Sequence, residues 1–163
     1  MEKIITDRDL FFLSLALDEG RVAADLGEVP IGALLVENNE IVTRGHNMRE
    51  SLNDPTAHAE IIAIREASRR LGRWRLTGST LYVTSEPCPM CAGAIVQARV
   101  KRLVFGAYDK KGGGCGSIVN IPENERLNHR VEVIGGVQAE EGRQLLQTFF
   151  RGLREREKAG VTS

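Results

Sequence analysis

The chain has 163 residues, of which 42% are hydrophobic, and this composition is ordinary for a globular protein, excluding a disordered or collagen-like chain. Its 22 basic and 22 acidic residues cancel, so overall charge argues neither for nor against a nucleic-acid partner, and any basic surface must be local. The length fits one domain, and we expect residues 1–163 to form it.

The sequence contains no evident targeting or membrane segment. The apolar stretch Leu10–Leu17 is short and has acidic neighbours on both sides, whereas a spanning helix needs about 20 apolar residues. The three cysteines do not resemble the disulfide framework of a secreted protein. We therefore expect a cytoplasmic protein with no membrane partner.

Helix and turn signals organise the first half of the chain. Thr6 and Asp9 resemble a capping box that opens an amphipathic helix. Asn38 and Asn39 provide hairpin turn chemistry between two strands, and Asp54 stands beside a proline suited to the first turn of a helix. The predicted elements are a helix over residues 7–26, strands over 31–36 and 40–45, and a helix over 57–71 that ends at Gly72.

The second half also alternates strands with helices. The predicted elements are a strand over residues 80–84, a helix that opens at 87–89 and ends near 98, strands over 103–107 and 131–134, and a helix over 138–158. The glycine-rich segment 111–117 predicts a flexible loop. This alternation favours an α/β sandwich with a mixed sheet, and no linker divides the chain.

Two segments carry metal-binding chemistry: His58-Ala59-Glu60, and Cys88 with Cys91 in Pro-Cys-Pro-Met-Cys. Zinc prefers tetrahedral nitrogen and sulfur ligands, so one histidine and two cysteines leave a fourth position for water, as a catalytic site requires. The start of a helix lowers cysteine pKa and favours thiolates. On a regular helix the side chains of His58 and Glu60 would point about 200° apart around the axis. They can therefore reach one site only if that site lies across the first turn of the helix.

Alternative interpretations of these residues stay open. A lone Cys-x-x-Cys is more often a structural zinc knuckle or a redox pair, and an isolated histidine is usually a core residue. However, a zinc ribbon needs a second cysteine pair, and a redox pair does not account for His58 or Glu60. Cys115 is a further alternative, because as a fourth ligand it would close the site and make it structural.

The His-x-Glu and Pro-Cys-x-x-Cys pattern resembles the signature of the zinc deaminases. In that superfamily zinc activates a water molecule and the glutamate moves protons without binding the metal. More of the chain, about residues 8–155, is similar to the bacterial tRNA-specific adenosine deaminases. The matching stretches are Glu28–Ala33, Asp54–Ile61, Leu81–Thr84, Glu86–Cys88, Cys91–Ala94, Val104–Ala107, Gly116–Ser117, Asn128–Arg130 and Phe149–Arg151.

This resemblance implies a three-layer α/β/α sandwich with a five-stranded mixed sheet, of the cytidine deaminase-like fold. It implies a homodimer that binds one zinc ion per subunit and converts adenosine to inosine at the wobble position of a tRNA anticodon, typically of an arginine tRNA. Free guanine deaminases share Asp54–Glu60, so deamination of free guanine, cytosine or a nucleoside is an alternative. A non-catalytic zinc or RNA-binding module is another.

The resemblance also assigns roles to individual residues. His58, Cys88 and Cys91 hold zinc, and Glu60 is the proton shuttle. The residues expected to contact the substrate are Asn47, Ala59, Pro87, Asp109, Asn128 and Phe150. The chain departs from the family where Tyr108 and Leu153 replace common arginines and where the extra Cys115 occurs.

Two further features could serve an RNA partner. Arginines and lysines gather at 65–75, 110–111 and 151–158, although such runs are more often solvated faces than phosphate contacts. Phe149 and Phe150 could present a ring to an unstacked base, but both adjoin leucines, so we expect at least one of them in the core.

Overall fold

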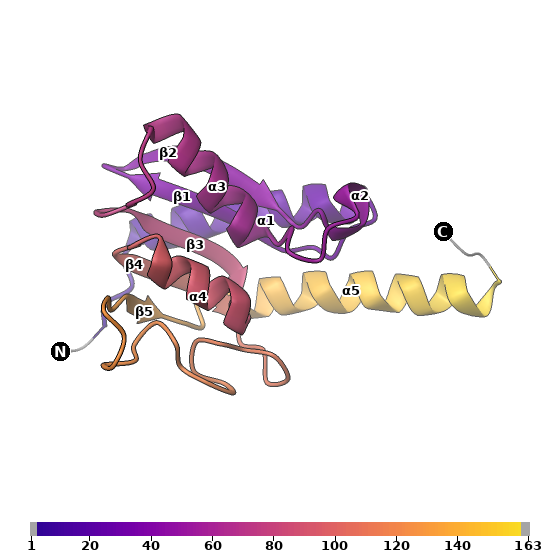
Figure 1. Ribbon diagram of the computed structural model, residues 1–163. Coiled ribbons are helices and arrows are strands. Elements are labelled where there is room, and N and C mark those ends of the chain that lie inside the picture. Colours follow the sequence, from indigo (N-terminus) through magenta and orange to yellow (C-terminus); the bar gives the residue numbers. More distant parts are fainter. Residues whose placement is uncertain (1–2, 161–163) are drawn as a thin grey trace.

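The computed structural model describes residues 3–160, so residues 1–2 and 161–163 of the predicted domain lie outside the described residues. Figure 1 shows the order of the elements along the chain. Their bounds are α1 Asp7–Asp25, β1 Gly32–Glu37, β2 Glu40–His46, α2 Arg49–Leu52, α3 Ala59–Leu71, β3 Thr80–Ser85, α4 Pro89–Gln97, β4 Arg102–Ala107, β5 Glu132–Ile134 and α5 Ala139–Lys158.

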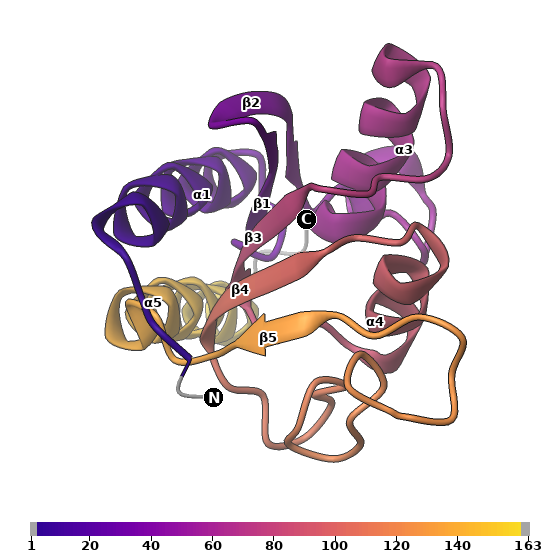
Figure 2. The ribbon, with the colours of Figure 1, turned by 90° about the vertical axis from the view of Figure 1, so that its left-hand side faces the viewer.

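The strands form one mixed sheet in the order β2-β1-β3-β4-β5. β1 is antiparallel to both β2 and β3, whereas β3, β4 and β5 are parallel to one another. Helices α1 and α5 cover one face of the sheet, and α3 and α4 cover the other (Figure 2). The predicted three-layer α/β/α sandwich with a five-stranded mixed sheet is therefore confirmed.

The hydrophobic core occupies both faces of this sheet. On the α3 and α4 side, Leu35, Leu81, Val83 and Phe105 pack with small and branched residues of the two helices. On the opposite side, the apolar residues of α1 pack against the alternate positions of β1, β3 and β4. Helices α3 and α4 lie side by side on one face of the sheet.

The local signals explain most element boundaries. Thr6 accepts the backbone N–H of Asp9 and Asp9 accepts that of Thr6, which confirms the capping box of α1. Asn38 and Asn39 both have positive φ angles, 51° and 64°, as a two-residue hairpin turn requires. Gly72 ends α3 in the left-handed conformation at φ 66°.

The prediction that Asp54 opens a helix is wrong. Its carboxylate accepts the backbone N–H and the hydroxyl of Thr56, which makes a local turn. Helix α3 begins only at Ala59, and His58 occupies its N-cap position in an extended conformation. The short helix α2, which has no buried residue and therefore no core-facing periodicity, was not predicted.

Two other expectations differ from the structure. The segment 111–117 is folded into turns: Gly113 N–H donates to Asp109 O, Ile118 N–H donates to Gly113 O, and Cys115 is buried. Neither phenylalanine of α5 is in the core: Phe149 is partly exposed and Phe150 is 41% exposed. The reason is that α5 continues well beyond the sheet (Figure 1), so its distal turns have no layer to pack against.

In the part of the chain that the structure describes, no helix is both long enough and apolar enough to cross a lipid bilayer.

Candidate active site

The site lies where the sheet topology brings two helix starts together. β2, β3 and β4 run in the same direction, because β1 is antiparallel to both β2 and β3 and β3 is parallel to β4. The segments that leave these strands therefore begin at the same edge of the sheet. His58 is the N-cap residue of α3 and Cys88 is the N-cap residue of α4, and neither side chain caps its own helix.

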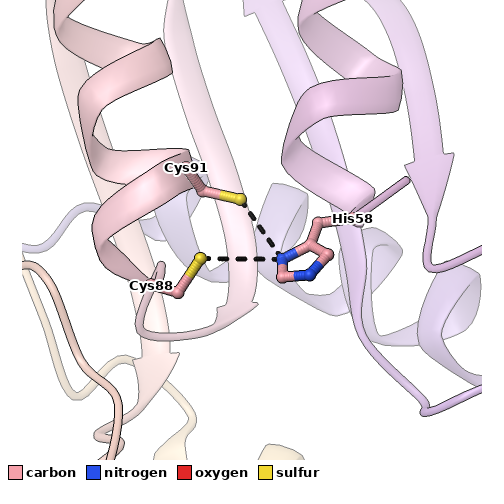
Figure 3. A group of neighbouring side chains, drawn as sticks. All are labelled: His58, Cys88 and Cys91. Atoms are coloured by element: carbon pink, nitrogen blue, oxygen red, sulfur yellow. Dashed lines mark hydrogen bonds between the residues drawn. The ribbon is translucent and has the colours of Figure 1, made fainter. Parts of the chain in front are cut away.

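Three potential metal ligands converge at these helix starts (Figure 3). The donor atoms of His58, Cys88 and Cys91 all lie within 4.8 Å of one another. His58 Nδ1 is 3.6 Å from Cys88 Sγ and 3.4 Å from Cys91 Sγ. A tetrahedral zinc ion with ordinary bond lengths holds a nitrogen and a sulfur ligand about 3.6 Å apart. The three side chains thus fit a tetrahedral cation with one position open.

The three groups also perturb one another's protonation. The Cys91 thiol donates to Cys88, and this bond, together with the one from His58, lowers the pKa of Cys88 to about 4. The same bond to Cys88 and burial raise the pKa of Cys91, and the contact with Cys88 raises the pKa of His58. A thiol with a low pKa is deprotonated at neutral pH, and the thiolate is the form of cysteine that binds a metal cation.

Glu60 lies beside the three ligands and lines the same cavity. It is only 4% exposed, and this burial raises the pKa of its carboxyl group. The separation of about 200° that a regular helix would impose on His58 and Glu60 does not apply. His58 precedes helix α3 in an extended conformation, and Glu60 lies in the first turn of that helix. A buried carboxyl with a raised pKa is suited to accept and return a proton.

A small cavity opens onto His58, Glu60 and Cys88 and has a volume of about 130 Å³. Three of the residues expected at the substrate, Asn47, Ala59 and Asp109, line it. Asn47 is buried, and its Oδ1 accepts the backbone N–H of Arg49. The other lining residues are Val29, Ile31, Arg49, Ser85 and Glu86.

A larger groove of about 720 Å³ adjoins this cavity, and the two share Val29, Ile31, Ser85 and Asp109 as walls. Phe150 lines the groove from α5. Lys110 and Lys111 add positive charge to its wall, where Arg143 pairs with Glu140. Tyr108, which is 56% exposed, adds an aromatic ring. The groove therefore combines positive charge and aromatic surface next to the cavity.

Three other residues singled out from the sequence line neither the cavity nor the groove. Asn128 is exposed on the connection between β4 and β5 and lines neither the cavity nor the groove. Pro87 is buried, and its carbonyl accepts the backbone N–H of Gly114. Cys115 is not in the ligand group; its Sγ lies 3.8 Å from Pro87 O, and burial raises its pKa.

The basic run at 65–75 is largely paired within the chain. Arg69 and Arg70 both bind Glu66, and Arg73 makes two hydrogen bonds to Glu37, of 2.6 and 2.8 Å. These internal partners favour a solvated structural face over a phosphate-binding surface. The two lysines that line the groove, Lys110 and Lys111, are the better candidates for contact with an anion, because Arg143 of α5 pairs with Glu140.

Sequence reasoning missed the roles of two buried carboxylates, of which Glu86 lines the cavity. Glu86 is 4% exposed and accepts bonds from the loop after β4, and Glu28 is 1% exposed and accepts the backbone N–H groups of Glu50 and Ser51. In the sequence both residues stand in stretches that match the family, Glu28–Ala33 and Glu86–Cys88, but nothing local marks them as buried. Such a residue looks solvent-exposed until its partners are known.

Comparison with known proteins agrees with this geometry. The family model of the MafB19-like deaminases matches residues 8–154. The tRNA-specific adenosine deaminase of Bacillus subtilis is 52% identical over 152 residues, which cover 93% of this chain and 94% of that protein.

Two solved structures are also similar to the chain. A tRNA:A34 deaminase, studied for A-to-I editing at the wobble position of transfer RNA, is 46% identical with a TM-score of 0.80 and covers 83% of this chain and 99% of its own. The guanine deaminase of Bacillus subtilis is 39% identical with a TM-score of 0.60, over 64% of this chain and 66% of its own. The chain shares 52% sequence identity with a tRNA-specific adenosine deaminase over 93% of its length, and it brings three metal-ligand side chains together. The chain therefore belongs to the tRNA-specific adenosine deaminase family.

Proposed function

We propose that the protein is a zinc-dependent deaminase that converts adenosine to inosine at the wobble position of a tRNA anticodon, with an arginine tRNA as the expected substrate. The observation that carries this proposal is the open ligand set of His58, Cys88 and Cys91 with Glu60 buried beside it. The reaction consumes one water and releases ammonia: the C6–N bond of adenosine breaks and a C6–O bond forms.

The protein groups have separate tasks in this reaction. His58, Cys88 and Cys91 would hold the zinc ion, which when bound would supply a Lewis acid that makes water more acidic. Glu60 takes a proton from the attacking water and gives it to the ring nitrogen beside C6. It then takes the second proton from the new C6 hydroxyl and gives it to the departing amine, which leaves as ammonia. Its burial supports this cycle, because the raised pKa of the Glu60 carboxyl lets it hold a proton between steps.

The cavity and the groove suggest how an anticodon loop is bound. The base enters the cavity between Asn47, Ala59 and Asp109, where the buried Asn47 amide can recognise it by hydrogen bonding. The neighbouring nucleotides follow the groove past Lys110, Lys111 and Phe150. A loop nucleotide is already unpaired, so its extrusion costs less than flipping a base out of a duplex. We also retain Pro87 and Asn128 as proposed contacts.

We further propose that the enzyme is a cytoplasmic homodimer. Exposed apolar residues at the start of α4 and in the connection between β4 and β5 support an interface there: Met90, Ile118, Val119 and Leu127 are each 38–58% exposed. A second copy covering this surface would also approach the exposed Asn128, which belongs to the same connection as Leu127. Light scattering of the purified protein distinguishes a dimer from a monomer.

The substrate is tested by offering the purified, zinc-loaded protein total bacterial tRNA and, separately, a synthetic anticodon stem-loop and free guanine. We expect inosine at the wobble position, detected by sequencing, and ammonia release from the stem-loop. Release of ammonia from guanine with an unchanged stem-loop would instead establish the alternative of free-base deamination, which the guanine deaminase similarity keeps open.

A further inference from the structure

The buried carboxylate of Glu86 joins two segments of the candidate site that are distant in sequence. Glu86 directly follows β3 and stands two residues before Cys88. Its backbone N–H donates to Ala107 O, at the end of β4, over 2.7 Å. The side chain is only 4% exposed and borders the cavity. Its position is therefore fixed by the sheet, while its oxygens face the loop that follows β4.

Both carboxylate oxygens are occupied by that loop. Oε1 accepts the backbone N–H of Asp109 at 3.0 Å and the hydroxyl of Ser117 at 2.5 Å. Oε2 accepts the backbone N–H groups of Cys115 at 3.1 Å and Ser117 at 3.0 Å. All four partners are donors, so the carboxylate acts only as an acceptor. Four donors from one loop thus converge on one buried carboxylate.

The loop sequence is adapted to this contact. A Cβ atom at Gly113 would lie 2.1 Å from Glu86 Oε2, and one at Gly114 would lie 2.7 Å from the backbone nitrogen of Pro89. Gly114 N–H also donates to Pro87 O at 2.7 Å. Bare backbone is therefore required where the loop passes over the carboxylate and over the start of α4.

The same loop supplies the wall between the cavity and the groove. Asp109 lines both spaces, and Lys110 and Lys111 line the groove. Asp109 Oδ1 accepts the backbone N–H groups of Lys111 and Gly112, so these residues form one turn. Glu86 binds the N–H at the start of this turn, so its carboxylate anchors the part of the loop that carries both lysines.

We propose that Glu86 is a positioning residue for RNA: it holds the 109–117 loop so that Asp109, Lys110 and Lys111 meet the nucleotides beside the target base. This role rests on the proposed function, since it concerns the same site. It predicts that Glu86 affects substrate affinity and leaves the chemical step and the metal ligands unchanged, because its oxygens are used by the loop and not by the reacting groups.

The test compares Glu86→Gln with the wild type in steady-state kinetics on an anticodon stem-loop. We expect KM to rise about tenfold, as for the loss of a charge-assisted hydrogen bond, with kcat within about twofold and one zinc per chain retained. Amide hydrogen exchange should accelerate at Asp109, Cys115 and Ser117. Ser117→Ala, which removes one of the four bonds, should raise KM by a few-fold and remains informative if the glutamine variant does not fold.

Asp9→Asn is the matched control, because Asp9 is an equally buried carboxylate that also accepts several bonds but lines neither the cavity nor the groove. It should lower stability and leave KM unchanged. An unchanged KM in Glu86→Gln, an equal rise in Asp9→Asn, or loss of zinc would overturn the proposal. If the wild type fails to deaminate the stem-loop, the proposed function is wrong. Amide hydrogen exchange at Asp109, Cys115 and Ser117 in Glu86→Gln still decides whether Glu86 holds the loop.

Discussion

Asp9 and Glu60 are two buried carboxyl groups in the same sandwich whose pKa values shift in opposite directions. Asp9 is 1% exposed at the start of α1, and Glu60 is 4% exposed at the start of α3. Burial favours the neutral form of both. For Asp9, hydrogen bonds from Arg102, Thr6 and Tyr82 outweigh burial and lower the pKa to about 2. For Glu60, burial prevails and raises the pKa.

The difference lies in the donors that the fold provides. Arg102 makes two hydrogen bonds to Asp9, of 2.6 and 2.7 Å, and the Tyr82 hydroxyl adds one of 2.8 Å. No cation of this kind is bonded to Glu60 among the described residues; it faces a cavity and two cysteines. A buried carboxylate with a full set of donors stabilises the fold, whereas one without them is able to exchange protons.

The largest expected effect is that of Glu60→Ala on catalysis. Loss of the proton-transfer group should lower kcat by about 10²–10⁴-fold, measured as inosine formation on the anticodon stem-loop. The zinc content, measured by elemental analysis, should remain at one per chain, because Glu60 is not in the ligand group. Ordinary turnover by a zinc-loaded Glu60→Ala protein would contradict the assigned role.

Asp9→Asn should affect stability instead of chemistry. The change leaves the partly buried Arg102 with only a distant partner, Glu132 at 3.9 Å, and breaking such a pair costs about 3 kcal/mol. The free energy of unfolding, measured with urea, should fall by this amount while kcat stays unchanged. Asp18→Asn on the same helix is the control: its exposed pair with Arg21 should contribute almost nothing.

The low pKa of Asp9 also predicts a pH dependence of stability. Since the folded-state pKa is depressed from 3.8 to about 2, the stabilising contribution is complete above the unfolded value. It is lost as the pH falls through the folded value. The unfolding free energies of the wild type and Asp9→Asn should therefore approach each other by about 2 kcal/mol between neutral pH and about pH 2. If the difference in unfolding free energy between the two proteins stays constant with pH, the charge of Asp9 does not contribute to stability.

The smallest expected effect concerns the capping box next to Asp9. Thr6→Ala removes the side-chain acceptor of the Asp9 N–H and should lower the unfolding free energy by about 1 kcal/mol. Thr6→Ser keeps the hydroxyl and should retain most of that stability. If the two variants are equally destabilised, the methyl group of Thr6 and not its hydrogen bond would be responsible.

Much of this arrangement could be predicted from local patterns. The helix and strand periods, the capping box at Thr6 and the turn at Asn38–Asn39 are short-range signals, and the ligand set follows from the spacing of Cys88 and Cys91 with a separate histidine. Asp54 illustrates the limit, because the same residue type caps helices and closes local turns. Here the turn is made with Thr56, only two residues away, so the presence of a nearby donor does not by itself tell a turn from a helix cap.

Long-range partners could not be predicted. Asp9 and Arg102 are 93 residues apart, and Glu86 binds Ser117 across 31 residues. Both acidic residues look like ordinary surface positions in sequence. Likewise, the apolar side of α5 indicates a core position for Phe149 or Phe150, but the helix extends past the sheet, so only the tertiary arrangement shows that its distal part is uncovered.

The convergence of His58 with Cys88 across 30 residues has a consequence for folding. The ligands meet only after the strands between them have paired, so the unfolded chain cannot bind a cation with the same geometry. A cation held there acts as a removable cross-link between α3 and α4, and its binding free energy adds to the free energy of folding. Occupancy of the site therefore reports on folding of the chain as well as on readiness for catalysis.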